Sequence, residues 1–123
     1  MQVDERTRKS SDLGVRTKAF ALSIVRLYQR LPESGEARVI GRQFLRSGTS
    51  VGAQYREAKR ARSKLEFAAK IEGALQELEE TGYWIELIQE LKILPSDSLE
   101  SVYLELKELT AMLVSSANTA KLK

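Results

Sequence analysis

The side chains in this chain that could do chemistry are carboxylates, amines and guanidinium groups, because the sequence contains no cysteine and no histidine. The absence of cysteine removes thiolate nucleophiles, disulfides and zinc–thiolate sites. The absence of histidine removes the commonest general base and the commonest transition-metal ligand. We therefore expect a protein that is not an enzyme, with no catalytic residue, no metal site and no cofactor.

The clearest chemical pattern is a basic stripe between residues 38 and 64. Arg38, Arg42 and Arg46 recur every four residues, so they share one side of a helix. Glu57 is the only acid in this segment, and the stripe is therefore not neutralised by its own helix. A phosphate backbone is the natural complement of such a surface. The candidate nucleic-acid-binding residues are Arg38, Arg42, Arg46, Arg56, Lys59, Arg60, Arg62 and Lys64.

Acidic residues further along the chain offer a second partner for the stripe. Residues 1–64 hold 15 Lys/Arg and 6 Asp/Glu, whereas residues 65–123 hold 5 Lys/Arg and 11 Asp/Glu. The arginines could therefore pair with the acidic third helix, inside one subunit or across a boundary between subunits. Those glutamates could also hold a metal, but di-iron helical bundles ordinarily use Glu-x-x-His pairs, so we favour a structural role. The acids concerned are Glu72, Glu77, Glu79, Glu80, Glu86 and Glu90.

A run of small residues from Ser47 to Ala53 interrupts the basic stripe. It contains Gly48 and Gly52, and a glycine inside a helix costs about 1 kcal/mol relative to alanine. Such a cost indicates that another backbone approaches closely, from a neighbouring helix or from another subunit. A phosphate-binding loop is the alternative, but the Walker lysine pattern and the preceding strand are missing. The candidate interface residues are Gly48, Gly52, Tyr55 and Trp84.

Long helices must position these side chains, because apolar residues recur at helical spacing and only two prolines occur. Pro32 and Pro95 each follow a helical pattern and mark its end. The first helix should begin at Ser11 or Asp12 and end near Pro32, and the second should run from about residue 36 to residue 61. The first helix is expected to turn inward Val15, Leu22, Val25, Leu27 and Tyr28.

The boundary between the second and third helices depends on a local signal. Ser63 and Glu66 have the spacing of a capping box, which predicts a break near Arg62, and one continuous helix is the alternative. The last helix should begin at Ser96 or Asp97. We predict an all-α, antiparallel up-down-up-down four-helix bundle over residues 12–123, preceded by a flexible N-terminal segment, residues 1–11. The third helix has a heptad-like seam of Phe67, Ile71, Ala74, Leu78, Thr81, Ile85 and Ile88.

Nothing in the sequence predicts export or membrane insertion. The first residues mix acids with bases and lack the apolar stretch of a secretory signal. No uncharged apolar run approaches the roughly 20 residues needed to cross a bilayer. We therefore expect a cytoplasmic protein.

The second and third helices also carry a family resemblance. The run Arg46-Ser-Gly-Thr-Ser-Val-Gly-Ala-Gln-Tyr-Arg-Glu-Ala58, followed by Ser63, Phe67, Lys70, Glu77, Glu80-Thr81 and Tyr83-Trp84, resembles the bacterial four-helix-bundle proteins encoded in 23S ribosomal RNA intervening sequences. The accessory variability protein of diversity-generating retroelements is a relative of that family. Gln54 stands where relatives often have asparagine, which keeps the amide. The outer helices agree in pattern and length rather than in motif.

The resemblance implies a ring-like homopentamer without established catalytic residues. It also implies a basic surface suited to nucleic acid and, in the retroelement branch, to a reverse transcriptase. We expect the nucleic acid to be RNA. The branch to which this chain belongs stays open.

Three functional hypotheses follow. The first is a non-enzymatic oligomer that binds structured RNA or an RNA–protein complex through the basic stripe. The second is a protein-interaction scaffold whose stripe is used in subunit contacts. The third is a metal-dependent enzyme that uses the glutamates.

Overall fold

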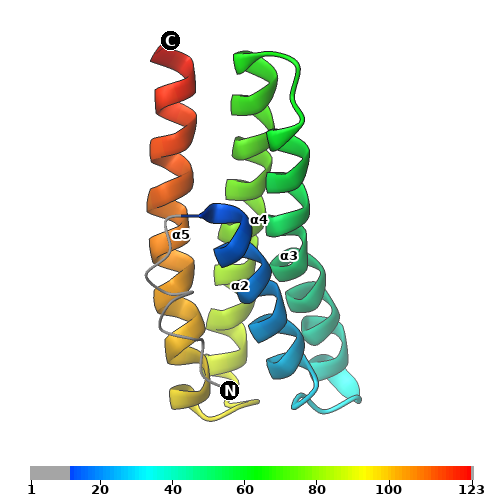
Figure 1. Ribbon diagram of the computed structural model, residues 1–123. Coiled ribbons are helices and arrows are strands. Elements are labelled where there is room, and N and C mark those ends of the chain that lie inside the picture. Colours follow the sequence, from blue (N-terminus) through cyan, green and yellow to red (C-terminus); the bar gives the residue numbers. More distant parts are fainter. Residues whose placement is uncertain (1–11, 123) are drawn as a thin grey trace.

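The computed structural model describes residues 12–122, which form four α-helices joined by short turns (Figure 1). Helix α2 spans Leu13–Tyr28, α3 spans Gly35–Lys59, α4 spans Lys64–Glu90 and α5 spans Ser96–Leu122. Successive helices run in opposite directions, so the all-α up-down-up-down bundle predicted from the sequence is confirmed. The expectation for residues 1–11 falls outside the described part of the chain. Within residues 12–122, no helix has the length and apolar character of a membrane span.

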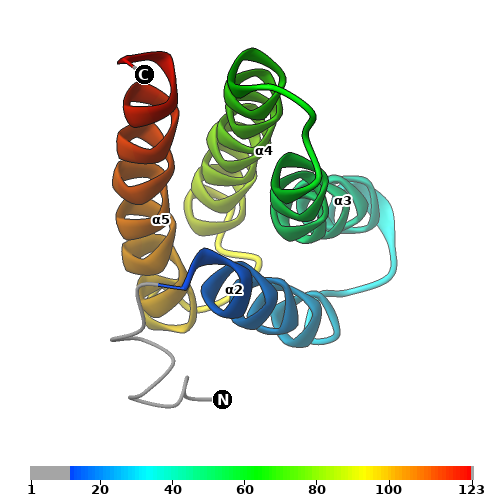
Figure 2. The ribbon, with the colours of Figure 1, turned by 45° about the horizontal axis from the view of Figure 1, so that its top comes forward.

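The four helices enclose one core. Among the described residues, α2 packs against α3 and α5, and α4 packs against the same two helices, so α2 and α4 lie diagonally opposite each other (Figure 2). The predicted seam of α4 faces this core, and Phe67 is its only member that is not fully buried. The largest side chains with less than 2 % exposure are Phe20, Ile24, Phe44, Ile71, Leu78, Ile85, Ile88, Leu99, Leu109 and Leu113.

Helix α2 turns a different side inward from the one predicted. Val15 and Leu22 are each 44 % exposed, whereas Phe20 and Ile24 are buried. The prediction for Val15 and Leu22 was therefore wrong, that for Leu27 is confirmed, and Tyr28 is partly buried against the core as predicted. The physical reason is that α2 carries apolar residues around most of its circumference, so spacing alone does not fix which side packs.

Local capping contacts set the helix boundaries. The Asp12 carboxylate accepts hydrogen bonds from the Gly14 and Val15 amides at 2.8 and 3.3 Å and so begins α2. The Ser63 hydroxyl accepts from the Glu66 amide at 3.0 Å, which confirms the predicted break between α3 and α4. Helix α4 ends at Glu90, and Lys92, just beyond its cap Leu91, is left-handed with φ of 56°.

Candidate nucleic-acid interface

The basic residues identified from the sequence lie on the outward side of α3 and on the turn that follows it. All eight are exposed, while the opposite side of α3 contributes Phe44 and Val51 to the core. Because α3 ends at Lys59, the last of these cations belong to the turn into α4 and to the first residue of α4. We call the set the basic surface: Arg38, Arg42, Arg46, Arg56, Lys59, Arg60, Arg62 and Lys64.

Arg46 is a member of the basic surface that forms ion pairs with α4. Its guanidinium forms an ion pair with Glu77 at 3.3 Å and a second with Glu80, both on α4. We call these three residues the Arg46 cluster. The hydrogen bond with Glu80 raises the pKa of Arg46 above its ordinary value. The pairing of stripe and third helix inside one subunit therefore holds for Arg46.

Six other cations of the basic surface have no such compensation. Within residues 12–122 none of them forms an ion pair with a carboxylate, and each is exposed. Glu57, the acid inside the stripe, is occupied by Lys70 of α4 at 3.0 Å. A polyanion could therefore reach these charges from outside the subunit. They are Arg38, Arg42, Arg56, Lys59, Arg60 and Arg62.

Gly48 and Gly52 of α3 face α2 of the same chain. A Cβ atom at Gly48 would lie 2.6 Å from the side chain of Ile24, and one at Gly52 would lie 3.3 Å from Thr17. Of the two contacts that the sequence left open, the structure shows the one with a neighbouring helix. Their role in a subunit interface stays a prediction, and this intramolecular contact accounts for the glycines without one.

The other two interface candidates occupy different environments. Tyr55 is only 9 % exposed and belongs to the core. Trp84 is half-buried, its indole N–H donates to Glu80 at 3.0 Å, and its ring meets that of Tyr83 edge-on with centroids 5.0 Å apart. The Trp84 hydrogen bond and then the Arg46 contact lower the pKa of Glu80. Tyr83 is 54 % exposed, so the accessible ring of this pair is Tyr83.

A buried arginine on α2 was missed by the sequence reasoning. Arg16 is 5 % exposed, and it donates to Glu105 at 3.0 Å and to Glu108 at 3.1 Å, both on α5. Its Nη1 also lies 3.3 Å from the sulfur of Met112. We call Arg16, Glu105 and Glu108 the Arg16 cluster. The sequence signal was its spacing, because Arg16 lies four residues before Phe20 and so shares the buried side of α2.

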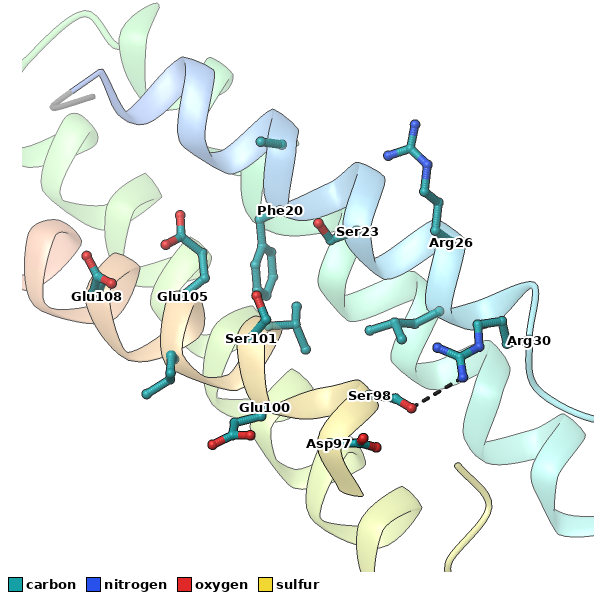
Figure 3. Close-up of a pocket in the computed structure, with 14 residues that line it drawn as sticks. Phe20, Ser23, Arg26, Arg30, Asp97, Ser98, Glu100, Ser101, Glu105 and Glu108 are labelled. Atoms are coloured by element: carbon teal, nitrogen blue, oxygen red, sulfur yellow. Dashed lines mark hydrogen bonds between the residues drawn. The ribbon is translucent and has the colours of Figure 1, made fainter. Parts of the chain in front are cut away.

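Beside this cluster, α2 and α5 leave an open groove of about 390 Å³ (Figure 3). Phe20 points between the two helices at its floor, and Arg30, in the turn after α2, donates to the Ser98 hydroxyl on α5 at 3.3 Å. Asp97 and Glu100 lie on the α5 side. The groove thus carries charges of both signs.

The carboxylates do not gather into a metal site in the described part of the chain. Among residues 12–122, no group of three or more acidic side chains lies close enough to hold an ion. The glutamates of α4 instead face α3, as in the Arg46 cluster, or solvent.

Comparisons with known proteins identify the family. A family model described as "23S rRNA-intervening sequence protein" matches residues 11–115. A crystal structure from Bacteroides thetaiotaomicron, described as a protein of unknown function from the S23 ribosomal protein family, is 36 % identical to this chain. The match covers 85 % of this chain and 96 % of that one, with a TM-score of 0.80. A search of curated proteins found no match. This chain belongs to the 23S rRNA-intervening sequence protein family.

Proposed function

We propose that this protein is a non-enzymatic cytoplasmic oligomer that binds structured RNA, or an RNA–protein complex, through the basic surface of α3. The supporting observation is that six cations of that surface are exposed and form no ion pair within residues 12–122. From the family resemblance we also propose that the oligomer is a homopentamer. For the retroelement branch, we propose a reverse transcriptase as the protein partner.

The physical basis of the proposal is counterion release. Each phosphate that a lysine or arginine neutralises releases condensed counterions, so affinity falls with salt by a logarithmic slope of about 0.7 to 0.9 per contact. Because six cations that are unpaired in the described part of the chain lie on one side of a subunit, we expect the contribution of counterion release to RNA affinity to be large. Arg46 contributes less, because its charge is already countered by two carboxylates.

The test measures RNA affinity as a function of salt. Fluorescence anisotropy with a labelled stem–loop RNA would compare the wild type with the triple variant Arg38→Glu, Arg42→Glu and Arg60→Glu. We expect weaker binding and a salt slope that is smaller by about 2 to 3, since three phosphate contacts are removed.

A matched control changes the net charge equally at cations outside the basic surface. The variant Arg26→Glu, Lys92→Glu and Lys107→Glu alters exposed side chains on α2, on the α4–α5 turn and on α5. It should retain most of the affinity. A salt-independent affinity in the wild type, or an equal loss in the control, contradicts the proposal.

A second function is favoured by the acidic outward side of α4. Glu79, Glu86 and Glu90 are exposed there, beside the exposed ring of Tyr83. In an interaction scaffold, the basic surface of one subunit would pack against this side of the next. Light scattering at low and high salt separates the two functions, because a scaffold closed by ion pairs dissociates in salt. Such an oligomer would also leave RNA without a binding surface.

A further inference from the structure

The outward side of α3 has a repeated pattern that the charges alone do not explain. Arg42, Thr49 and Arg56 are spaced by seven residues, which is close to two helical turns, so they form a row along the helix. Arg46, Ala53 and Arg60, the last of them directly after the end of α3, have the same spacing. The first row therefore carries at both ends a cation that is unpaired within residues 12–122 and a small residue between them, whereas in the second row Arg46 is already paired with Glu77 and Glu80.

The spacing of the charges allows contact with two phosphate backbones. Arg42 and Arg56 are fourteen residues apart, which at ~1.5 Å per residue separates them by roughly 21 Å along the helix. Between them lie the small, accessible side chains of Thr49, Ser50 and Ala53, beside the Arg46 guanidinium that is held against α4. Such a surface can approach a groove while its two ends contact the phosphates on either side of it.

The hydroxyl oxygens of Thr49 and Ser50, in the middle of α3, are available to accept hydrogen bonds from a ligand. Thr49 donates to the Leu45 carbonyl at 2.8 Å, and Ser50 donates to the Arg46 carbonyl at 2.6 Å. Each hydroxyl has a single proton, which is used in this bond, and its oxygen keeps acceptor capacity. Both residues are partly exposed. They can therefore accept a hydrogen bond from a ligand, and the donor that distinguishes RNA from DNA is the ribose 2′-hydroxyl.

Unpaired bases have no stacking platform on this surface. Proteins that bind single strands stack bases on exposed aromatic rings. The aromatic residues of α3 are Phe44 and Tyr55, which are 0 % and 9 % exposed. The exposed ring of Tyr83 lies on α4 in a glutamate-rich stretch that includes Glu79 and Glu86, where the charge repels phosphates.

We propose that the ligand of the basic surface is double-helical RNA, held across its minor groove. The two ends of α3 contact phosphates, and Thr49 and Ser50 accept hydrogen bonds from ribose 2′-hydroxyls. The wide, shallow minor groove of A-form RNA, which displays these hydroxyls, admits such a helix. This inference rests on the proposed function and specifies its substrate class.

The experiment compares three probes of one sequence, namely an RNA duplex of about 16 base pairs, the DNA duplex and the RNA single strand. Binding is measured by anisotropy at an ionic strength of about 0.15 M. We expect the RNA duplex to bind tightest. The variant Thr49→Ala/Ser50→Ala should weaken binding of the RNA duplex about tenfold and leave binding of the DNA duplex unchanged, because only RNA loses two hydrogen bonds.

The matched control is Thr110→Ala, since Thr110 on α5 makes the same kind of bond to the Leu106 carbonyl at 2.8 Å and lies outside the basic surface. It should bind all three probes as the wild type does. Equal or tighter binding of the single strand, or an unchanged RNA preference in the double variant, overturns the inference while the proposed function stands. Salt-independent or absent binding of every probe overturns the proposed function as well.

Discussion

Two arginines of this bundle contact the neighbouring helix with the same chemistry in different surroundings. In the Arg16 cluster the guanidinium reaches from α2 to two glutamates on α5, and in the Arg46 cluster it reaches from α3 to two glutamates on α4. In both clusters the glutamates are three residues apart. Arg16 is 5 % exposed, whereas the side chain of Arg46 is 48 % exposed. The two clusters thus share the spacing of their glutamates and differ in how far the arginine is buried.

Burial decides what each cluster can contribute to stability. An exposed ion pair adds little, because water and salt screen it and two long side chains must be ordered. A buried cluster is strongly destabilised when one partner is removed, because the remaining charge stays out of water. The Arg16 cluster also joins two helices that leave an open groove and pack less extensively than α2 and α3 do. We infer that charge contributes more to the contact of α2 with α5 than to its contact with α3, where Gly48 and Gly52 allow close approach.

The largest expected effect comes from Arg16→Met, which removes the cation and keeps a side chain of similar length. The Glu105 side chain, 13 % exposed, is then left without its partner. We expect the free energy of unfolding to fall by about 3 kcal/mol, measured by urea denaturation at fixed protein concentration.

The double variant Arg16→Met/Glu105→Leu provides the control for this prediction. It removes both charges and should recover more than half of the loss, since no buried carboxylate remains. If Arg16→Met lowers the free energy of unfolding by less than about 1 kcal/mol, the Arg16 cluster contributes no more than an exposed ion pair does. The proposed difference between the Arg16 and Arg46 clusters would then be wrong.

The contact of α2 with α3 is tested by Gly48→Ala. The added Cβ atom would lie 2.6 Å from Ile24, so the two helices must move apart, at a cost of about 2 kcal/mol. Gly82→Ala on α4 is the matched control, because its Cβ atom would meet Leu106 at 3.8 Å, an ordinary contact. That variant should gain up to about 1 kcal/mol from helix propensity. Similar melting temperatures for both variants would contradict close packing at Gly48.

A smaller effect is expected from Arg46→Met. The loss of stability should stay below about 1 kcal/mol, because this cluster is exposed. The salt slope of RNA binding should also change less than in Arg42→Met, since Arg46 is occupied by two carboxylates and Arg42 forms no ion pair within residues 12–122. If the two variants reduce the slope equally, the Arg46 cluster opens to bind RNA.

Much of the fold follows from patterns that act over a few residues. The capping box at Ser63 and the heptad-like seam of α4 depend on local spacing, and both were predicted from the sequence. The inward side of α2 was not, because Val15 and Leu22 are as apolar as the residues that pack. Their place depends on where α3 and α5 lie, which is a tertiary property that spacing does not contain.

In the candidate site, too, some features follow from local spacing and others depend on tertiary contacts. The basic stripe and its outward direction follow from four-residue spacing against a buried opposite side. The partners of Arg46 and Arg16 lie 31 to 34 and 89 to 92 residues away in sequence, so nothing local indicates them. For that reason the sequence could not separate the compensated Arg46 from the uncompensated cations, nor identify the glutamates that pair with Arg16, although the spacing of Arg16 from Phe20 indicates the buried side of α2.

The smallest expected effect is a pH dependence in the Arg46 cluster. The Trp84 N–H and then Arg46 lower the pKa of Glu80 from its ordinary value of 4.5. A depressed folded pKa contributes stability that is complete above the unfolded value and is lost as the pH falls through the folded value. Trp84→Phe removes the larger cause, so the pKa of Glu80 should rise, which carboxyl-resolved NMR titration can follow. Tyr83→Phe keeps the ring beside Trp84 and should leave the titration unchanged. If wild-type Glu80 instead titrates at its ordinary value, solvent has screened the effect of both contacts on its pKa. The difference in strength between the exposed Arg46 cluster and the buried Arg16 cluster would then be larger.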